Sequence, residues 1–193
     1  LWGMNNTGQT GGTTDADIDA PDAWEFTKGS HEILVGVIDT GVDYNHEDLA
    51  ATMRVNEAEY NGTAGVDDDG NGIVDDIHGA RWTNGDGTVS SGDPMDGQGH
   101  GTHCSGTIGA VGNNGIGVAG INWKVRIMGL KFLDDEGSGY DTDAVSALEY
   151  AIEQGAHLTS NSWGSNVYSQ ALADAIVAAG QANQLFIAAA GND

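Results

Sequence analysis

The feature that most constrains the fold is a run of apolar residues that ends abruptly in an acid. Residues 33–38 read Ile-Leu-Val-Gly-Val-Ile, and Asp39 and a glycine turn at Gly41 follow directly. An apolar run without polar alternation is typical of a strand buried on both faces of a parallel sheet. Asp39 would then stand at the carboxyl end of that strand, where open α/β sheets place their chemistry.

Strand and helix patterns alternate along the chain. We expect further strands over 126–133, 157–162 and 185–190, and helices over 19–29, 141–154 and 169–181. Asp19 is expected to cap the first helix, and the last helix should turn Leu172, Ile176 and Val177 inward. The alternation predicts one α/β domain over residues 1–193, with a parallel β-sheet flanked by helices and right-handed crossovers.

The composition limits the classes of partner. The chain has 193 residues, of which 39% are hydrophobic, so it can fill a real core. With 29 acidic against 6 basic side chains its net charge is −23, which opposes binding to nucleic acid or to an anionic membrane surface and favours cations. No apolar run reaches the roughly 18 residues of a membrane span. The single cysteine, Cys104, excludes an internal disulfide.

Glycines surround one histidine. Gly97, Gly99, Gly101 and Gly106 leave almost nothing bulky beside His100, as a reactive imidazole pressed against a substrate backbone would need. We interpret His100 as a catalytic base.

Two other interpretations of this stretch stay open. His100 and His103 could form an i, i+3 metal pair, but no His-Glu-x-x-His pattern supplies the further ligand of a zinc site. Cys104 could be a nucleophile, although a small packing residue is the favoured interpretation because no second histidine motif would activate it.

Five short motifs in a fixed order resemble the subtilisin-like serine proteases, or subtilases. They are the Asp box around Asp39, the His box from His100, an Ala-Ala-Ala-Gly-Asn box ending at Asn192, and two segments between them. The resemblance implies a three-layer α/β fold and serine endopeptidase activity, with Asp39 and His100 as members of a triad and Asn192 as an oxyanion donor. It also implies substrate binding by Gly137, Ser138, Gly139, Ser162, Trp163 and Gly164.

The Gly-Thr-Ser-x-Ala box that carries the nucleophile of this family is absent from the 193 residues. We therefore expect an amino-terminal portion of a catalytic domain, incomplete at its carboxyl end and inactive alone. The expected partners are protein or peptide substrates, a pro-segment and the carboxyl-terminal remainder of the same domain, with a secreted location. The alternative is a non-catalytic calcium-binding pseudoprotease or recognition domain.

A long polar insertion near residues 52–92 carries an acidic loop. Asp67, Asp69, Asn71 and Asp76 place oxygen ligands at intervals around two glycines, which suits a calcium ion. The alternative is an acidic surface loop.

The family resemblance implies a second calcium site. Its ligands would be the side chains of Asp48 and Asn114 and the carbonyls of Ile116 and Val118. Calcium is thus the expected cofactor.

Overall fold

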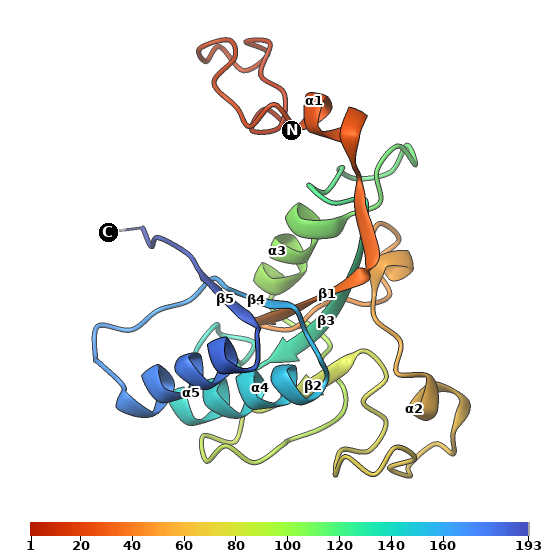
Figure 1. Ribbon diagram of the computed structural model, residues 1–193, viewed down its shortest axis with the longest axis vertical. Helices are drawn as coiled ribbons and strands as arrows, with labels where there is room; N and C mark the ends of the chain where they lie inside the picture. The colour runs from red at the N-terminus through yellow and green to blue at the C-terminus, as the bar shows by residue number, and fades with distance from the viewer. Residues whose placement is uncertain (193) are drawn as a thin grey trace.

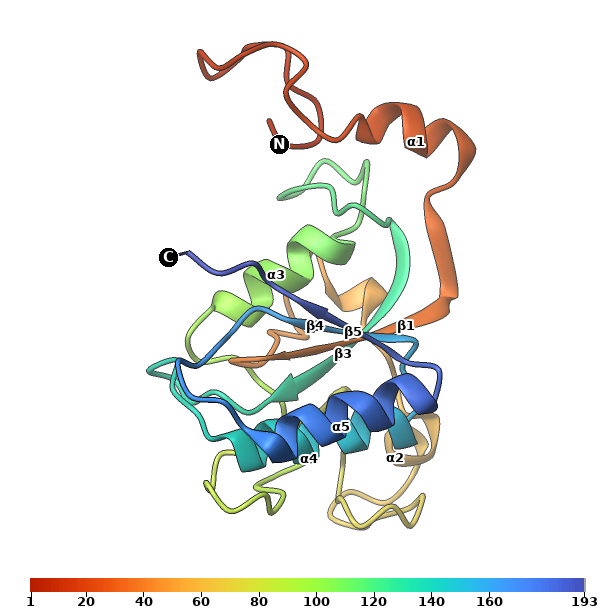
Figure 2. The same cartoon turned by 60° about the vertical axis from the view of Figure 1, so that its left-hand side comes forward.

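The computed structural model describes residues 1–192, in which a five-stranded parallel sheet lies between two layers of helices (Figures 1 and 2). The strands lie in the order β2-β3-β1-β4-β5. Their bounds are β1 (Gly29–Asp39), β2 (Gly79–Arg81), β3 (Lys124–Lys131), β4 (Leu158–Asn161) and β5 (Leu185–Ala188). The helices are α1 (Ala20–Phe26), the 3-10 turn η1 (Ala50–Thr52), α2 (Glu57–Asn61), α3 (His100–Gly109), α4 (Asp141–Glu153) and α5 (Gln170–Gln181). The predicted α/β fold is confirmed.

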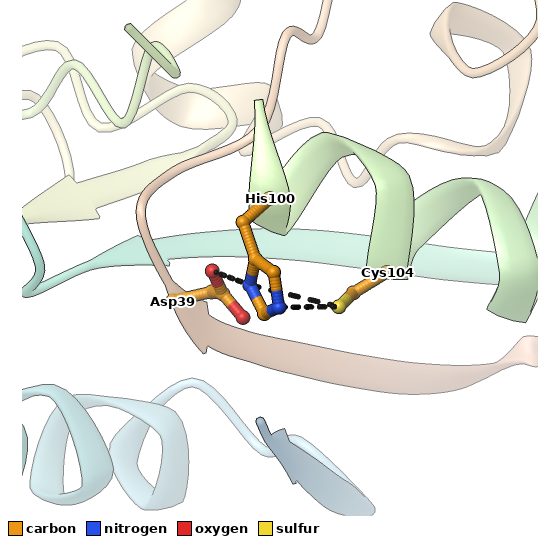
Figure 3. Close-up of side chains that lie close together, drawn as sticks. All are labelled: Asp39, His100 and Cys104. Carbon is orange, nitrogen blue, oxygen red and sulfur yellow. Dashed lines mark hydrogen bonds and ion pairs between the residues drawn. The ribbon is translucent and has the colours of Figure 1, made fainter. Parts of the chain in front are cut away.

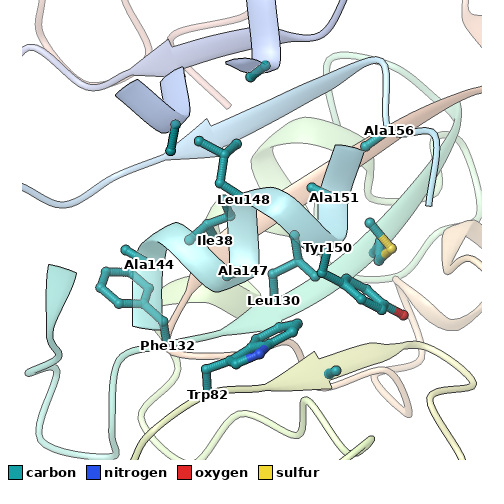
Figure 4. Close-up of a cluster of buried hydrophobic side chains, with 14 of the residues drawn as sticks. Ile38, Trp82, Leu130, Phe132, Ala144, Ala147, Leu148, Tyr150, Ala151 and Ala156 are labelled. Carbon is teal, nitrogen blue, oxygen red and sulfur yellow. The ribbon is translucent and has the colours of Figure 1, made fainter. Parts of the chain in front are cut away.

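Strand β1 is central and buried on both faces. Ile38 packs with Leu148 of α4 in one hydrophobic cluster (Figure 4), to which Leu34 also belongs. Val35 and Val37 belong to a second cluster that contacts α3. Figure 2 shows α3 on one side of the sheet and α4 with α5 on the other. Because alternate side chains of a strand point to opposite faces, two apolar layers explain the unbroken apolar run. Asp39 lies two and four positions after Val37 and Val35 in the strand, so its side chain points to the same face of the sheet, towards α3.

Three details differ from the sequence-based expectation. Asp19 adopts a left-handed conformation with φ of 51°, and its side chain makes no capping hydrogen bond to α1. That helix ends at Phe26, and β1 begins at Gly29. Val177 is 58% exposed, because one residue beyond Ile176 rotates its side chain away from the sheet.

The polar insertion reaches the sheet. It contains α2 and the short strand β2, whose Ala80 pairs with Leu130 of β3 at the sheet edge. Three residues are too few for a strand to be recognised from periodicity. Among residues 1–192, no helix is long and apolar enough to span a membrane.

Candidate active site

Asp39 at the end of β1 and His100 at the start of α3 face each other (Figure 3). The Asp39 Oδ1 atom lies 2.7 Å from His100 Nδ1. The carboxylate side chain is 1% exposed and the imidazole is 46% exposed. A buried carboxylate bonded to Nδ1 fixes the ring orientation and leaves Nε2 for proton transfer on the accessible side.

The carboxylate of Asp39 is held at one oxygen only. Its Oδ1 atom also accepts a hydrogen bond of 2.7 Å from the backbone amide of Thr40. Its Oδ2 atom is buried and makes no hydrogen bond within the described part of the chain. The Thr40 hydroxyl in turn accepts a bond of 2.9 Å from the Gly101 amide, which ties the end of β1 to the first turn of α3.

Asp96 lies three residues before Gly99, the N-cap of α3, and its side chain caps the first turn of this helix from there. Its Oδ1 atom accepts hydrogen bonds from the Gln98 and Gly99 amides at 2.9 and 2.8 Å, and its Oδ2 atom accepts one of 3.0 Å from the Thr102 amide. Burial opposes ionisation of Asp96, but these bonds and one from the Thr102 hydroxyl together hold its pKa below the usual value. This residue could not be recognised from the sequence, because the preference for Asp applies to the N-cap position and Asp96 lies three residues before it.

The two segments expected to bind substrate lie together beside His100. Gly137, Ser138 and Gly139 line one wall of a groove that also includes the imidazole, and residues 162–164 line it as well. Trp163 donates a hydrogen bond of 2.9 Å to the Ile38 carbonyl and packs edge-on against Phe132, with ring centroids 4.8 Å apart. Its indole is therefore fixed by the strand that ends in Asp39.

Asn192 lies at a neighbouring hollow that it shares with His100. The hollow is also lined by Trp163 and Gly164, so it continues the groove past the imidazole. Asn192 follows the end of β5, as the sequence indicated, and it is exposed. The three polar side chains thus come from the ends of β1 and β5 and the start of α3.

Cys104 lies one helical turn after His100 (Figure 3). Its sulfur is 3.9 Å from Nδ1 and 4.0 Å from Nε2 of that ring. Burial, and to a smaller extent the Asp39 charge, raise the pKa of the thiol, so it is protonated at neutral pH. In the described residues His100 groups with Asp39 and Cys104 as possible metal ligands, and His103 does not join them.

The acidic loop of the insertion is folded around its own carboxylates. Asp67 and Asp69 lie close to Glu59 of α2, which sequence analysis missed and which is 3% exposed. Glu59 Oε1 accepts bonds from the amides of Asp68 and Asp69 at 2.7 and 3.0 Å.

Asp76 lies deeper than the other acids of this loop. It is fully buried, and burial raises its pKa. Its carboxylate accepts hydrogen bonds from Asn56 and Asn71 at 2.8 and 2.9 Å, and a short one from the Tyr150 hydroxyl of α4.

The residues of the second predicted calcium site also lie close together, with Asp48 against the loop 114–118. Asp48 is 2% exposed, and its Oδ1 atom accepts a bond of 2.7 Å from the Asn114 amide group. The backbone amide of Val118 donates to Asp48 Oδ2 at 2.8 Å, and that of Ile116 donates to Asn114 Oδ1 at 3.0 Å. The loop 114–118 therefore wraps the Asp48 carboxylate.

Comparison with known proteins agrees with this geometry. Residues 30–193 match the model of the subtilase family. The chain is 46% identical over 133 residues to subtilisin-like protease 1 of Plasmodium vivax, an alignment covering 69% of this chain and 20% of that protein. It is 34% identical over 175 residues to thermitase of Thermoactinomyces vulgaris, covering 91% of this chain and 52% of thermitase.

A third relative aligns over the whole chain. The cell wall-associated protease of Bacillus subtilis is 33% identical over 195 residues, which cover 100% of this chain and 19% of that protein. The chain thus spans between about a fifth and half of the length of these curated relatives. The family match extends from the start of β1 to the segment after β5 and includes both walls of the groove. The chain belongs to the subtilase family.

Proposed function

We propose that the chain is the amino-terminal portion of a serine endopeptidase domain. The observation that carries the proposal is the 2.7 Å contact between the buried Asp39 carboxylate and the accessible His100 imidazole at the head of a groove. A paired imidazole of this kind activates a hydroxyl nucleophile. The nucleophilic serine is proposed to come from the carboxyl-terminal remainder of the domain.

In this mechanism each residue acts on a defined atom. His100 Nε2 takes the serine proton as the hydroxyl attacks the peptide carbonyl, and later gives that proton to the leaving amine. Asp39 holds the ring tautomer and stabilises the imidazolium. Asn192 donates from its side-chain amide to the oxygen that becomes negative. The peptide lies as an added strand between residues 137–139 and 162–164.

Calcium is proposed to stabilise two loops. The donors fit a hard cation, because Glu59, Asp67 and Asp69 group their carboxylates in the acidic loop and the glycine-rich loop 114–118 encloses the Asp48 carboxylate. No lysine or arginine side chain donates to these carboxylates among the hydrogen bonds of the described residues. Asp48, Asn114 and the carbonyls of Ile116 and Val118 would hold one ion. Asp67, Asp69, Asn71 and Asp76, with Glu59, would hold the other. Thermal unfolding measured with calcium and with a chelator tests whether these loops bind the ion. Free calcium at about 100 times Kd would raise the free energy of unfolding by about 2.7 kcal/mol per site.

A secreted enzyme that is made with a pro-segment is the proposed biological form. The acidic surface, with a net charge of −23, suits a medium rich in cations. A calcium-binding pseudoprotease or recognition domain is the competing function, since it would use the same groove without a nucleophile.

Labelling separates the two functions. The complete gene product should react with a fluorophosphonate at one serine and cleave a denatured protein substrate, and His100→Ala should lose both reactions. His103→Ala is the matched control, because that exposed histidine makes no contact with Asp39 in the described structure. A folded gene product that neither labels nor cleaves, yet binds peptides, would establish the recognition domain instead.

A further inference from the structure

We propose that Lys131 is a positioning residue that joins the turn after Asp39 to the loop forming one wall of the groove; this inference rests on the proposed peptidase function. Lys131 is the last residue of β3 and is only 3% exposed. A lysine is almost never fully buried unless it is paired, so its position calls for an explanation.

The strand register places Lys131 beside Asp39, the carboxylate that orients His100. In the pairing of β1 with β3, Asp39 stands opposite Lys131. Val125 and Ile127 of β3 belong to the cluster on the α3 side of the sheet. Lys131 has the same parity as these residues and therefore faces α3, as Asp39 does.

The ammonium group makes two contacts. Lys131 Nζ donates to the carbonyl of Thr40 at 2.5 Å, and it lies 2.9 Å from Asp135 Oδ1. Thr40 is the residue whose amide bonds to Asp39 and whose hydroxyl bonds to the first turn of α3. Through one residue, the lysine thus acts on both partners of the Asp39 and His100 pair.

Asp135 connects Lys131 to the loop that lines the groove. It immediately precedes Glu136, Gly137 and Ser138, which line the groove with His100. Its carboxylate also lies against Gly97, where an added Cβ would come within 2.5 Å of the carboxyl carbon. The Lys131 and Asp135 pair therefore links the Asp39 turn, the substrate loop and the segment before His100.

Stability alone does not account for this arrangement. The Asp135 side chain is 63% exposed, and an ion pair with a solvated carboxylate contributes little to folding. The buried ammonium group also donates to the Thr40 carbonyl, and Thr40 follows Asp39 directly in the chain. The geometry favours a role in alignment of the acid, the base and the substrate loop.

Three variants of the complete gene product test the role, with kcat and KM measured per active site titrated by fluorophosphonate. Lys131→Met should lower kcat at least about tenfold, because small misplacements of catalytic groups have large effects on rate. Lys131→Arg should restore much of that loss. Asp135→Asn should raise KM about threefold or more and leave kcat within about twofold, since it weakens the tie to the substrate loop and leaves the bond from Lys131 to the Thr40 carbonyl in place.

Lys124→Met is the control, because Lys124 is an exposed lysine at the opposite end of the same strand. The proposal is wrong if Lys131→Met and Lys124→Met give the same kcat, or if Lys131→Met lowers only the number of titratable sites.

A second readout does not require hydrolysis. The proton shared by Asp39 and His100 Nδ1 should give a low-field NMR signal in the wild-type protein and in Lys124→Met, and Lys131→Met should shift or broaden it. An unchanged signal in Lys131→Met overturns the positioning role. If the wild-type protein shows this signal and its dependence on Lys131 but cleaves no peptide, the peptidase proposal fails while the positioning of the pair stands.

Discussion

The backbone of Gly101 lies against Gly41, and a Cβ added at residue 101 would come within 2.1 Å of the Gly41 carbonyl oxygen. Gly41 has φ of 112°, a conformation that L side chains rarely adopt. The first turn of α3 can therefore approach the end of β1 closely enough for His100 to reach Asp39 only because residue 101 is glycine, and the turn that presents the Gly41 carbonyl needs glycine for its positive φ.

We predict that Gly101→Ala destabilises the protein by about 1–3 kcal/mol and lowers activity, because the added methyl group separates α3 from β1. Gly106→Ala is the matched control on the same helix, since nothing lies within 4 Å of its added Cβ. It should raise stability by about 0.5–1 kcal/mol. Urea unfolding measures both, and equal effects of the two substitutions would contradict the packing argument.

The Asp96 cap should make stability depend on pH. The folded pKa of Asp96 is depressed, so its contribution is present above the unfolded pKa of 3.8 and is lost as pH falls through the folded value. Asp96→Asn should cost about 1–2 kcal/mol near neutral pH, allowing for partial exposure. Urea midpoints should differ at neutral pH and converge with the wild type as pH falls from about 5 towards 2. A gap that stays constant across this range would argue against an ionised cap.

Cys104 should be dispensable for catalysis. Its raised pKa keeps the thiol protonated at neutral pH, and a protonated thiol is a poor nucleophile. Cys104→Ala should retain kcat within about threefold, and the rate of alkylation by iodoacetamide should rise only in alkaline solution. Complete loss of peptidase activity in a folded Cys104→Ala protein would favour the thiol mechanism that the sequence left open.

Asn192→Ala should lower kcat about 10²- to 10³-fold, the loss seen when an oxyanion donor is removed from subtilisin, with little change in KM. Asn166 lines the same hollow, so Asn166→Ala removes an identical amide group from another position and is the matched control. A large rise in KM with an unchanged kcat would place Asn192 in ground-state binding instead.

The fold and the Asp39 and His100 pair were predictable because they depend on local patterns. The apolar run before Asp39 marked the central strand, and the glycines around His100 marked a close backbone approach. Both segments of the groove were expected from the family motifs and lie together in the structure. The calcium sites, the role of Asn192 and the source of the nucleophile stay predictions.

Other features depend on contacts between distant segments and left no local pattern. Glu59 joins the acidic loop only because α2 folds back on it. In the sequence, Lys131 is one polar residue at the end of a predicted strand, and nothing nearby indicates that its ammonium group is buried against Thr40. The left-handed turn at Asp19 replaced the expected side-chain cap. Each outcome was decided by tertiary geometry, which outweighs local propensity.

The central position of β1 has a consequence for how the protein is made. Val37 pairs with Gly129 on one side and with Ser160 on the other, so β1 is synthesised well before both of the strands that flank it in the sheet. Until then its apolar side chains have no sheet to enter, and pairings of such long range form slowly. Newly made chains should therefore depend on assistance that shields this strand during synthesis.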